Sequence, residues 1–197
     1  MAASPTPSTE STSAKRTHLM AVAQRTFYRD GFRVVGIDTL LAEAGVAKMT
    51  LYNHFASKEE LIVAVIEQHD AGVRASLGAA IEAAGRSPAR RLTAVFDWLK
   101  AWFGRDDFKG CFFLRALSEY PDPAHPIHRA AWRHKVAVND VLVELVTAAG
   151  AGQPTELAAA LSLLINGAIL SAHATGSPAA ADTARSAATT LLKQAVA

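Results

Sequence analysis

The sequence predicts an all-α protein in which a small N-terminal helical domain precedes a larger helical domain. Half of its 197 residues are hydrophobic, and Ala and Leu, which favour helices, are abundant among them. The alternating β-branched pattern that marks strands is missing, whereas apolar residues recur at spacings of three and four. A chain of this length is long enough to form one or two domains with a sizeable core.

The first 14 residues are rich in Ser, Thr, Pro and Ala. Because they include few large apolar side chains, residues 1–14 are expected to form a disordered tail. The first helix is then predicted for residues 15–30, and Gly31 ends it, since Gly adopts the left-handed backbone found at helix ends. The face of this helix that packs inward comprises Leu19, Val22, Ala23, Thr26 and Phe27.

Residues 37–55 are the stretch around which the N-terminal domain is organised. Residues 37–44 carry apolar side chains at the i, i+3, i+4, i+7 spacing of one buried helix face. Gly45 allows a sharp turn, and a second short helix is predicted for residues 48–55. Two helices joined in this way make a helix-turn-helix, whose second helix fits the major groove of DNA. The predicted core comprises Phe27, Phe32, Ile37, Leu40, Val46, Leu51 and Phe55.

Four stretches add a more specific pattern: Gly31-Phe32, Ile37 to Val46, Thr50-Leu51-Tyr52-Asn53-His54-Phe55, and Lys58-Glu59-Glu60-Leu61. At this distance from the N-terminus, the pattern resembles the DNA-binding domain of the TetR/AcrR family of transcriptional regulators. The resemblance covers roughly residues 15–65. It implies a three-helix helix-turn-helix domain over residues 15–56 and an effector-binding and dimerisation domain over residues 57–197.

The outer side of the second helix supplies the candidate DNA contacts. Lys48 suits guanine, Asn53 suits adenine, and Met49 suits a thymine methyl group. The resemblance implies phosphate contacts from Tyr52 and Lys58. The same side chains would also fit an ordinary solvated helix face, and His54 would equally suit a capping or packing role. The predicted set is Thr39, Lys48, Met49, Thr50, Tyr52, Asn53, His54 and Lys58.

Six further helices are predicted towards the C-terminus. Ser57 as N-cap and Glu60 three residues later form a capping box, so the first of them begins near Lys58 and runs to about Ala83. Pro and Gly mark the limits of the others, which cover residues 88–103, 111–120, 126–149, 154–174 and 178–197. The last two are apolar or small on more than one face. This predicts a homodimer through a four-helix bundle, with Leu161 and Leu191 at the contact.

The C-terminal helices carry a group of aromatic side chains that suits an apolar effector pocket, although large aromatics at helical spacing also suit a plain core. Asn166 is a polar position within an apolar helix. The predicted ligand-binding residues are Trp98, Trp102, Phe103, Phe113, Trp132 and Asn166. The segment from Gly110 to Glu119 follows the G-C-x-x-x-x-A-x-x-E pattern of one TetR subgroup. Its Cys111 is interpreted either as a small core side chain or as a sensor thiol.

Composition excludes several other classes of protein. The net charge is +2, and residues 15–60 hold seven Lys and Arg against five Asp and Glu, so bulk charge does not drive DNA binding. A single Cys excludes an intramolecular disulfide, and no apolar run is expected to approach the length of a membrane span. No catalytic, cofactor or metal-binding constellation is recognised, and His125 and His128 are separated by Pro126.

The sequence therefore predicts a cytoplasmic, ligand-responsive regulator of transcription. It would bind a palindromic double-stranded DNA operator as a homodimer, with repression the usual outcome in the family, and would respond to an unidentified small-molecule effector. The alternative is a small helical carrier or enzyme with a hydrophobic cavity and no DNA binding. A third reading is a relative that keeps the fold without binding DNA. The operator sequence, the effector and the direction of regulation are left open.

Overall fold

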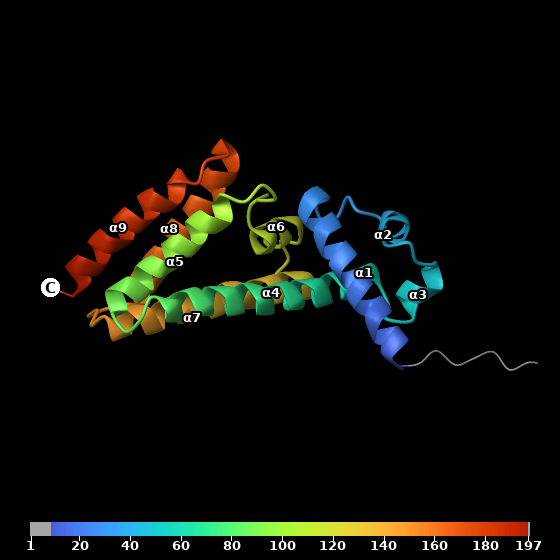
Figure 1. Cartoon of the computed structure of the whole chain (residues 1–197), viewed down its shortest axis with the longest axis horizontal. Coiled ribbons are helices and arrows are strands. Elements are labelled where there is room, and N and C mark those ends of the chain that lie inside the picture. Colours follow the sequence, from blue (N-terminus) through green and yellow to red (C-terminus); the bar gives the residue numbers. More distant parts are fainter. Residues whose placement is uncertain (1–8, 197) are drawn as a thin grey trace, which may run out of the picture. The chain divides into compact units, whose positions relative to one another are not determined.

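The computed structural model describes residues 9–196, which fold into nine α-helices without a strand (Figure 1). The all-α fold class predicted from the sequence is confirmed. The helices are α1 (Thr9–Asp30), α2 (Ile37–Ala44), α3 (Lys48–Tyr52), α4 (Lys58–Ala83), α5 (Pro88–Phe103), α6 (Phe112–Glu119), α7 (Pro126–Ala148), α8 (Pro154–Thr175) and α9 (Ala179–Ala195).

Two helices differ in extent from the expectation. α1 begins at Thr9 rather than at residue 15, because residues 9–14 contain neither Gly nor Pro and each residue added to a formed helix gains a backbone hydrogen bond. The remainder of the expected tail, residues 1–8, lies outside the described part of the chain. α3 ends at Tyr52 rather than at residue 55. There the amide of His54 donates to the carbonyl of Leu51 at 3.0 Å, a three-residue step that closes the helix.

The chain divides into two compact units. Unit 1 contains the described residues up to His69 together with Leu114–Ala131. Unit 2 contains Asp70–Phe113 and the residues from Trp132 onward. Helices α4, α6 and α7 therefore each contribute residues to both units. Unit 1 holds the helix-turn-helix, and unit 2 holds the long helices of the C-terminal part.

Unit 1 has a small core that joins its first three helices. The rings of Phe27 and Phe32 lie 5.5 Å apart, in the tilted arrangement that aromatic pairs favour. Ile37 and Val46, predicted for the same core, are only partly buried because each lies at a helix boundary next to a solvent-facing turn. The fully buried members are Phe27, Phe32, Leu40, Leu51 and Phe55.

The predicted capping box fixes the N-terminus of α4. The amide of Glu60 donates to Ser57 Oγ at 3.1 Å, and the Glu60 carboxylate accepts the amide of Ala56 at 2.6 Å. The return bond thus reaches Ala56, one residue before the N-cap. The first turns of α4 then bury a continuous apolar face, formed by Leu61, Ile62, Val65 and Ile66.

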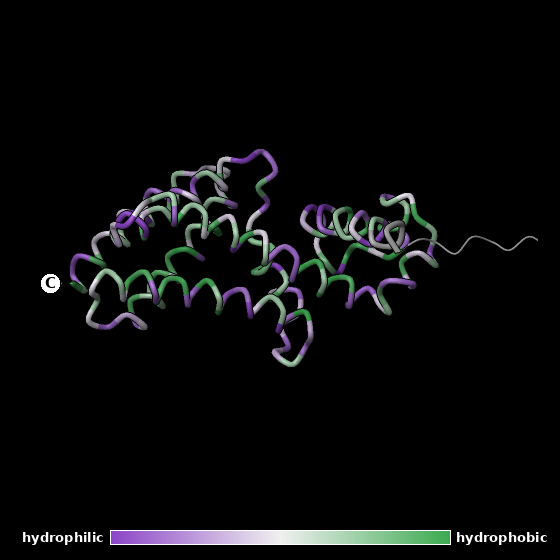
Figure 2. Tube along the Cα trace, turned by 60° about the horizontal axis from the view of Figure 1, so that its bottom comes forward, coloured by the Kyte–Doolittle hydropathy of each residue, from purple (hydrophilic) through white to green (hydrophobic). Residues whose placement is uncertain are grey.

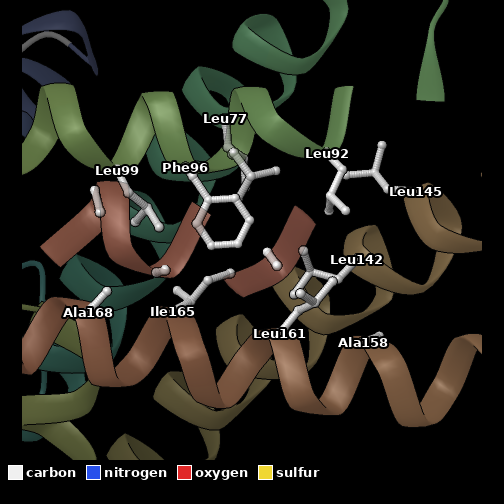
Figure 3. Close-up of a cluster of buried hydrophobic side chains, with 14 of the residues drawn as sticks. Leu77, Leu92, Phe96, Leu99, Leu142, Leu145, Ala158, Leu161, Ile165 and Ala168 are labelled. Carbon is white, nitrogen blue, oxygen red and sulfur yellow. The ribbon is translucent and has the colours of Figure 1, made fainter. Parts of the chain in front are cut away.

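Unit 2 is built on a single hydrophobic cluster contributed by α4, α5, α7, α8 and α9. Phe96 projects from α5 into its centre, towards Ile165 on α8 (Figure 3). Hydrophobic and hydrophilic residues alternate along these helices, as expected for helices with one buried face (Figure 2). Small residues line the buried side of α9, at Ala181, Ala184 and Ala188, which lets that helix pack closely.

α8 is a strongly apolar helix, and it differs from two expectations, one on the length of apolar runs and one on the role of Leu161. It is long and apolar enough by length and composition to cross a membrane, although a core helix of a soluble protein passes the same test. Its inward residues, including Leu161 at 0% exposure, pack within the subunit, so Leu161 is a core residue and not a dimer contact. Leu163 and Leu170 on the same helix are 73% and 67% exposed.

Candidate nucleic-acid interface

The turn between α2 and α3 is the local feature that makes the helix-turn-helix. Gly45 has φ +62°, a conformation that a residue with a Cβ adopts only at a cost. Its amide donates to the carbonyl of Ala42 at 3.3 Å, and the amide of Val46 donates to Leu41 at 3.2 Å. These bonds satisfy the last carbonyls of α2 while the chain turns sharply into α3.

α3 buries one side chain and leaves the others towards solvent. Leu51 is 0% exposed and anchors the helix to unit 1, whereas Met49 is 68% exposed and Tyr52 is 41% exposed. The remaining predicted contacts are also accessible: Thr39, Lys48 and Asn53 are exposed, and Thr50 and His54 are partly exposed. A side chain must reach out of the core to contact base edges or phosphates, and the predicted DNA-contact residues on α2, on α3 and directly after α3 meet that condition.

A hydrogen-bond network holds α2 against α1. The hydroxyl of Thr26, which is 0% exposed, donates to Glu43 Oε2 at 2.6 Å. Arg29 donates to the other oxygen of the same carboxylate, also at 2.6 Å. Hydrogen bonds from Arg29 and Thr26 lower the pKa of Glu43. A ring nitrogen of His18 bonds the carbonyl of Ala44, which further ties the end of α2 to α1. The sequence pattern gave no sign of this network.

Lys58 differs from the other candidates because its amino group already has a partner within unit 1. It donates to the carbonyl of Arg33 at 3.3 Å, and burial lowers its pKa. In this position Lys58 braces the loop between α1 and α2. A phosphate contact by Lys58 would require the amino group to share or exchange that bond.

The loop that follows α1 is held by Glu119 at the end of α6. The Glu119 carboxylate accepts the amides of Phe32 at 2.9 Å and Arg33 at 2.7 Å. The guanidinium of Arg33 lies 5.0 Å from the centre of the Tyr120 ring. Burial raises the pKa of Tyr120. The loop that orients α2 is therefore fixed by residues more than 80 positions away.

Arg115, one turn before Glu119, holds the other side of the same junction. It donates to the carbonyl of Tyr28 at 2.9 Å in the last turn of α1. A cation at that position also interacts favourably with the negative end of the helix. Glu119 and Arg115 belong to the segment whose sequence pattern marks a TetR subgroup. The pattern alone did not indicate that Arg115 bonds the end of α1 and Glu119 the loop after it.

The six predicted ligand-binding residues fall into separate places in unit 2. Trp98, Trp102 and Phe103 form one aromatic group on α5, joined by Phe108, whose ring centre lies 5.1 Å from that of Trp102. Phe113 is buried and stacks on the imidazole of His134 with ring centres 3.5 Å apart. Trp132 and Asn166 line a surface groove.

That groove runs between α7 and α8 and has a volume of about 540 Å³. Its walls include Trp132, Lys135, Asn139, Ser162, Leu163 and Asn166. The aromatic side chains of α5 pack in or against the core cluster, whereas Trp132 is exposed on α7. Cys111 is the one cysteine of the sequence, and its half-buried side chain packs against that cluster.

His125 and His128 each have an identified partner within unit 1. The amide of Ile127 donates to the His125 ring, and a ring nitrogen of His128 lies 2.7 Å from the carbonyl of Tyr120. Within residues 9–196, no group of three or more His, Cys, Asp or Glu side chains is arranged to hold a metal ion. These two histidines thus secure the segment between α6 and α7.

Comparison with known proteins adds independent evidence. Residues 19–65 match the family model of bacterial regulatory proteins of the tetR family, and residues 88–188 match the tetracyclin repressor-like C-terminal domain. The crystal structure of SCO4454, a TetR-family transcriptional regulator from Streptomyces coelicolor, is 34% identical. It superposes with a TM-score of 0.89 over 94% of this chain and 97% of that one.

Two curated relatives from Escherichia coli match over shorter spans. The HTH-type transcriptional regulator YjdC is 32% identical over 104 residues, 53% of this chain and 54% of the relative. The HTH-type transcriptional repressor NemR is 27% identical over 116 residues, 58% of each protein. The chain thus aligns with between half and three-fifths of the length of these two relatives. Both are regulators of transcription and not enzymes. The chain belongs to the TetR family and is a transcriptional regulator with a DNA-binding helix-turn-helix.

Proposed function

We propose that the protein is a homodimeric, effector-responsive repressor that binds an inverted-repeat operator through α3. The observation that carries this proposal is the exposed face of α3, where Lys48 and Met49 project from a helix anchored by Leu51 and the exposed Asn53 follows directly after the helix. In the division of roles, residues 15–56 bind DNA, and residues 57–197 bind the effector and the partner subunit. Such a regulator would act in the cytoplasm, where its operator lies.

The dimer contact is assigned to the outer face of α8 and α9. A shallow groove along these helices is lined by small and apolar residues, including Leu163, Gly167, Ala184, Ala187 and Leu191. Gly and Ala permit the close approach of a second helix pair, as in four-helix bundles. Leu163 and Leu170, both on α8, are too exposed for large apolar residues that remain in water. A two-fold dimer presents α3 twice, which matches a two-fold operator.

The response to an effector is assigned to unit 2. Effector binding would shift a balance between two arrangements of α3 in the dimer, and ligand acts only through its different affinity for the two. The helices α4, α6 and α7 provide the covalent connection, since each contributes residues to both units. Arg115 and Glu119 on α6 would carry such a shift to the α1–α2 loop. The repressor role of the relative NemR supports repression as the direction.

Two substitutions on α3 separate base reading from phosphate binding. Tyr52→Ala is expected to weaken binding to all DNA sequences alike, because a phosphate contact carries no sequence information. Lys48→Ala is expected to change which operator bases are preferred, at about 1–3 kcal/mol per lost bidentate contact. Fluorescence anisotropy against an operator and its single-base variants measures both effects.

Salt dependence and a matched control complete that experiment. With about eight phosphates neutralised per dimer, log affinity should fall against log salt concentration with a slope of roughly −7. Lys193→Ala removes the same charge from an exposed lysine on α9, which belongs to unit 2, and should leave operator preference unchanged. Equal losses for Lys48→Ala on every sequence would show that Lys48 does not read bases. An increase in target-gene expression on adding the protein to a reporter strain would contradict repression.

A further inference from the structure

The groove between α7 and α8 combines polar and apolar side chains. Trp132, Val136 and Leu163 give it exposed apolar walls, with 56%, 43% and 73% of their surface accessible. Four polar side chains, two from each helix, lie among these walls, and no acidic side chain lines the groove. Its volume of about 540 Å³ falls in the range of small-molecule sites.

The four polar side chains form two hydrogen-bonded pairs across the groove. The amino group of Lys135 on α7 donates to Asn166 Oδ1 on α8 at 2.7 Å. The hydroxyl of Ser162 on α8 donates to Asn139 Oδ1 on α7 at 2.9 Å. In each pair the amide oxygen is the acceptor that the protein uses. The amide nitrogens of Asn139 and Asn166 have no bonded acceptor among residues 9–196, so both remain available as donors.

Lys135 is a half-buried cation whose only hydrogen-bond partner in the described chain is neutral. None of the ion pairs found within residues 9–196 includes Lys135. Burial lowers its pKa, and an electrostatic interaction with Cys111 opposes that change. A charged group removed from water is costly unless it is paired, so this position would gain from an anion that enters the groove.

We propose that this groove binds a small apolar molecule carrying a carboxylate, which pairs with the ammonium group of Lys135. The carboxylate would accept from Lys135 and from the free amide hydrogens of Asn166 and Asn139. The apolar body would cover Trp132 and Val136. A carboxylate is favoured over a neutral head group because the site offers a cation and two amide donors and no acidic side chain lines it. This inference rests on the proposed function, since it names the chemical class of the effector.

Two probes of equal chain length test the role of the charge on the intact protein. Sodium octanoate and 1-octanol are titrated into the full chain by isothermal titration calorimetry, without DNA. The wild type is expected to bind octanoate at least about tenfold more tightly than 1-octanol, as a charge-assisted hydrogen bond in a partly buried site implies. Equal affinities would overturn the proposal without the need for any variant.

Three variants then test whether Lys135 causes the tighter binding of octanoate than of 1-octanol. Lys135→Met keeps the length and apolar stem of the side chain. Its affinity for octanoate should fall to its affinity for 1-octanol. Lys193→Met removes the same charge from an exposed position on α9 and should keep the preference. Lys135→Arg, which retains the charge, should still bind octanoate more tightly than 1-octanol. A preference that survives in a folded Lys135→Met variant would place the carboxylate elsewhere and overturn the assignment.

A fluorescence measurement places the probe within the groove. The chain has three tryptophans, and a Trp98→Phe, Trp102→Phe background leaves Trp132 as the only one. Octanoate is expected to change the Trp132 emission with the same affinity that calorimetry gives. If a second copy of the chain occupies the groove instead, Trp132 emission will follow protein concentration and not octanoate, which would also overturn the proposal. Because neither measurement uses DNA, failure here leaves the operator proposal intact, and loss of operator binding leaves this one intact.

Discussion

Replacing Leu163 and Leu170 together by Glu is expected to convert the protein into a monomer. Both side chains are largely exposed on one subunit, so the substitution leaves the fold of that subunit intact. In the proposed two-fold dimer each carboxylate is buried without a partner, and each substitution occurs twice. At about 3 kcal/mol or more for an unpaired buried charge, the dimer dissociation constant should rise at least about a hundredfold.

Light scattering coupled to size-exclusion chromatography measures the result as a halved molecular mass. Val34→Glu is the matched control, because Val34 is 83% exposed and belongs to unit 1, whereas α8 belongs to unit 2. It should leave the mass unchanged. A dimer mass in the double variant would mean that other helices form the contact. Leu161→Glu is unsuitable for this purpose, since it places a charge in the core and would unfold the subunit.

Gly31→Ala is expected to destabilise unit 1 by about 2–4 kcal/mol, from the strain of a positive φ together with the disturbed hydrogen bonds of Glu119. Gly31 has φ +96°, and a Cβ at this residue would lie 2.8 Å from Glu119 Oε1. The carboxylate cannot retreat freely, because its other oxygen holds the amides of Phe32 and Arg33. Urea denaturation followed by circular dichroism gives the change in unfolding free energy.

Gly45→Ala separates the two causes of that loss. Gly45 also has a positive φ, +62°, but a Cβ there meets nothing within 4 Å. Gly45→Ala should therefore lower the free energy of unfolding only through backbone strain, by about 1 kcal/mol. In a Glu119→Ala background the steric part of the Gly31→Ala loss should vanish, leaving a smaller increment. Equal losses for the two glycines in the wild-type background would show that the contact with Glu119 is unimportant.

The sequence predicted the parts of the fold that rest on local patterns. The apolar spacing of residues 37–44 with Gly45 gave the helix-turn-helix, and Ser57 with Glu60 gave the start of α4. The start of α1 was missed because a helix propagates through Ser and Thr residues once it has formed. The end of α3 was missed because tight three-residue closure leaves no clear signal in the residue types.

Contacts between distant residues were beyond sequence reasoning. The hydrogen bonds between the Glu119 carboxylate and the α1–α2 loop join residues 86 and 87 positions apart, and they depend on how α6 packs. Leu161 and Leu163 are both apolar residues of one helix, and their spacing alone did not separate the core face from the exposed face. For the same reason the spacing of Trp102 and Trp132 did not indicate that Trp132 lines the groove between α7 and α8. Lys135, the charged residue among those that line this groove, was not among the predicted ligand contacts.

The central claim is that α3 binds a specific inverted repeat, and operator binding tests it most directly. Duplexes covering the DNA that flanks the protein's own coding region are titrated by fluorescence anisotropy at fixed salt, with random-sequence DNA of equal length as reference. The account predicts that one segment containing an inverted repeat binds at least about a thousandfold more tightly than the reference, with two subunits per site. Affinity for every flanking segment and for other palindromes equal to that for random-sequence DNA would contradict it.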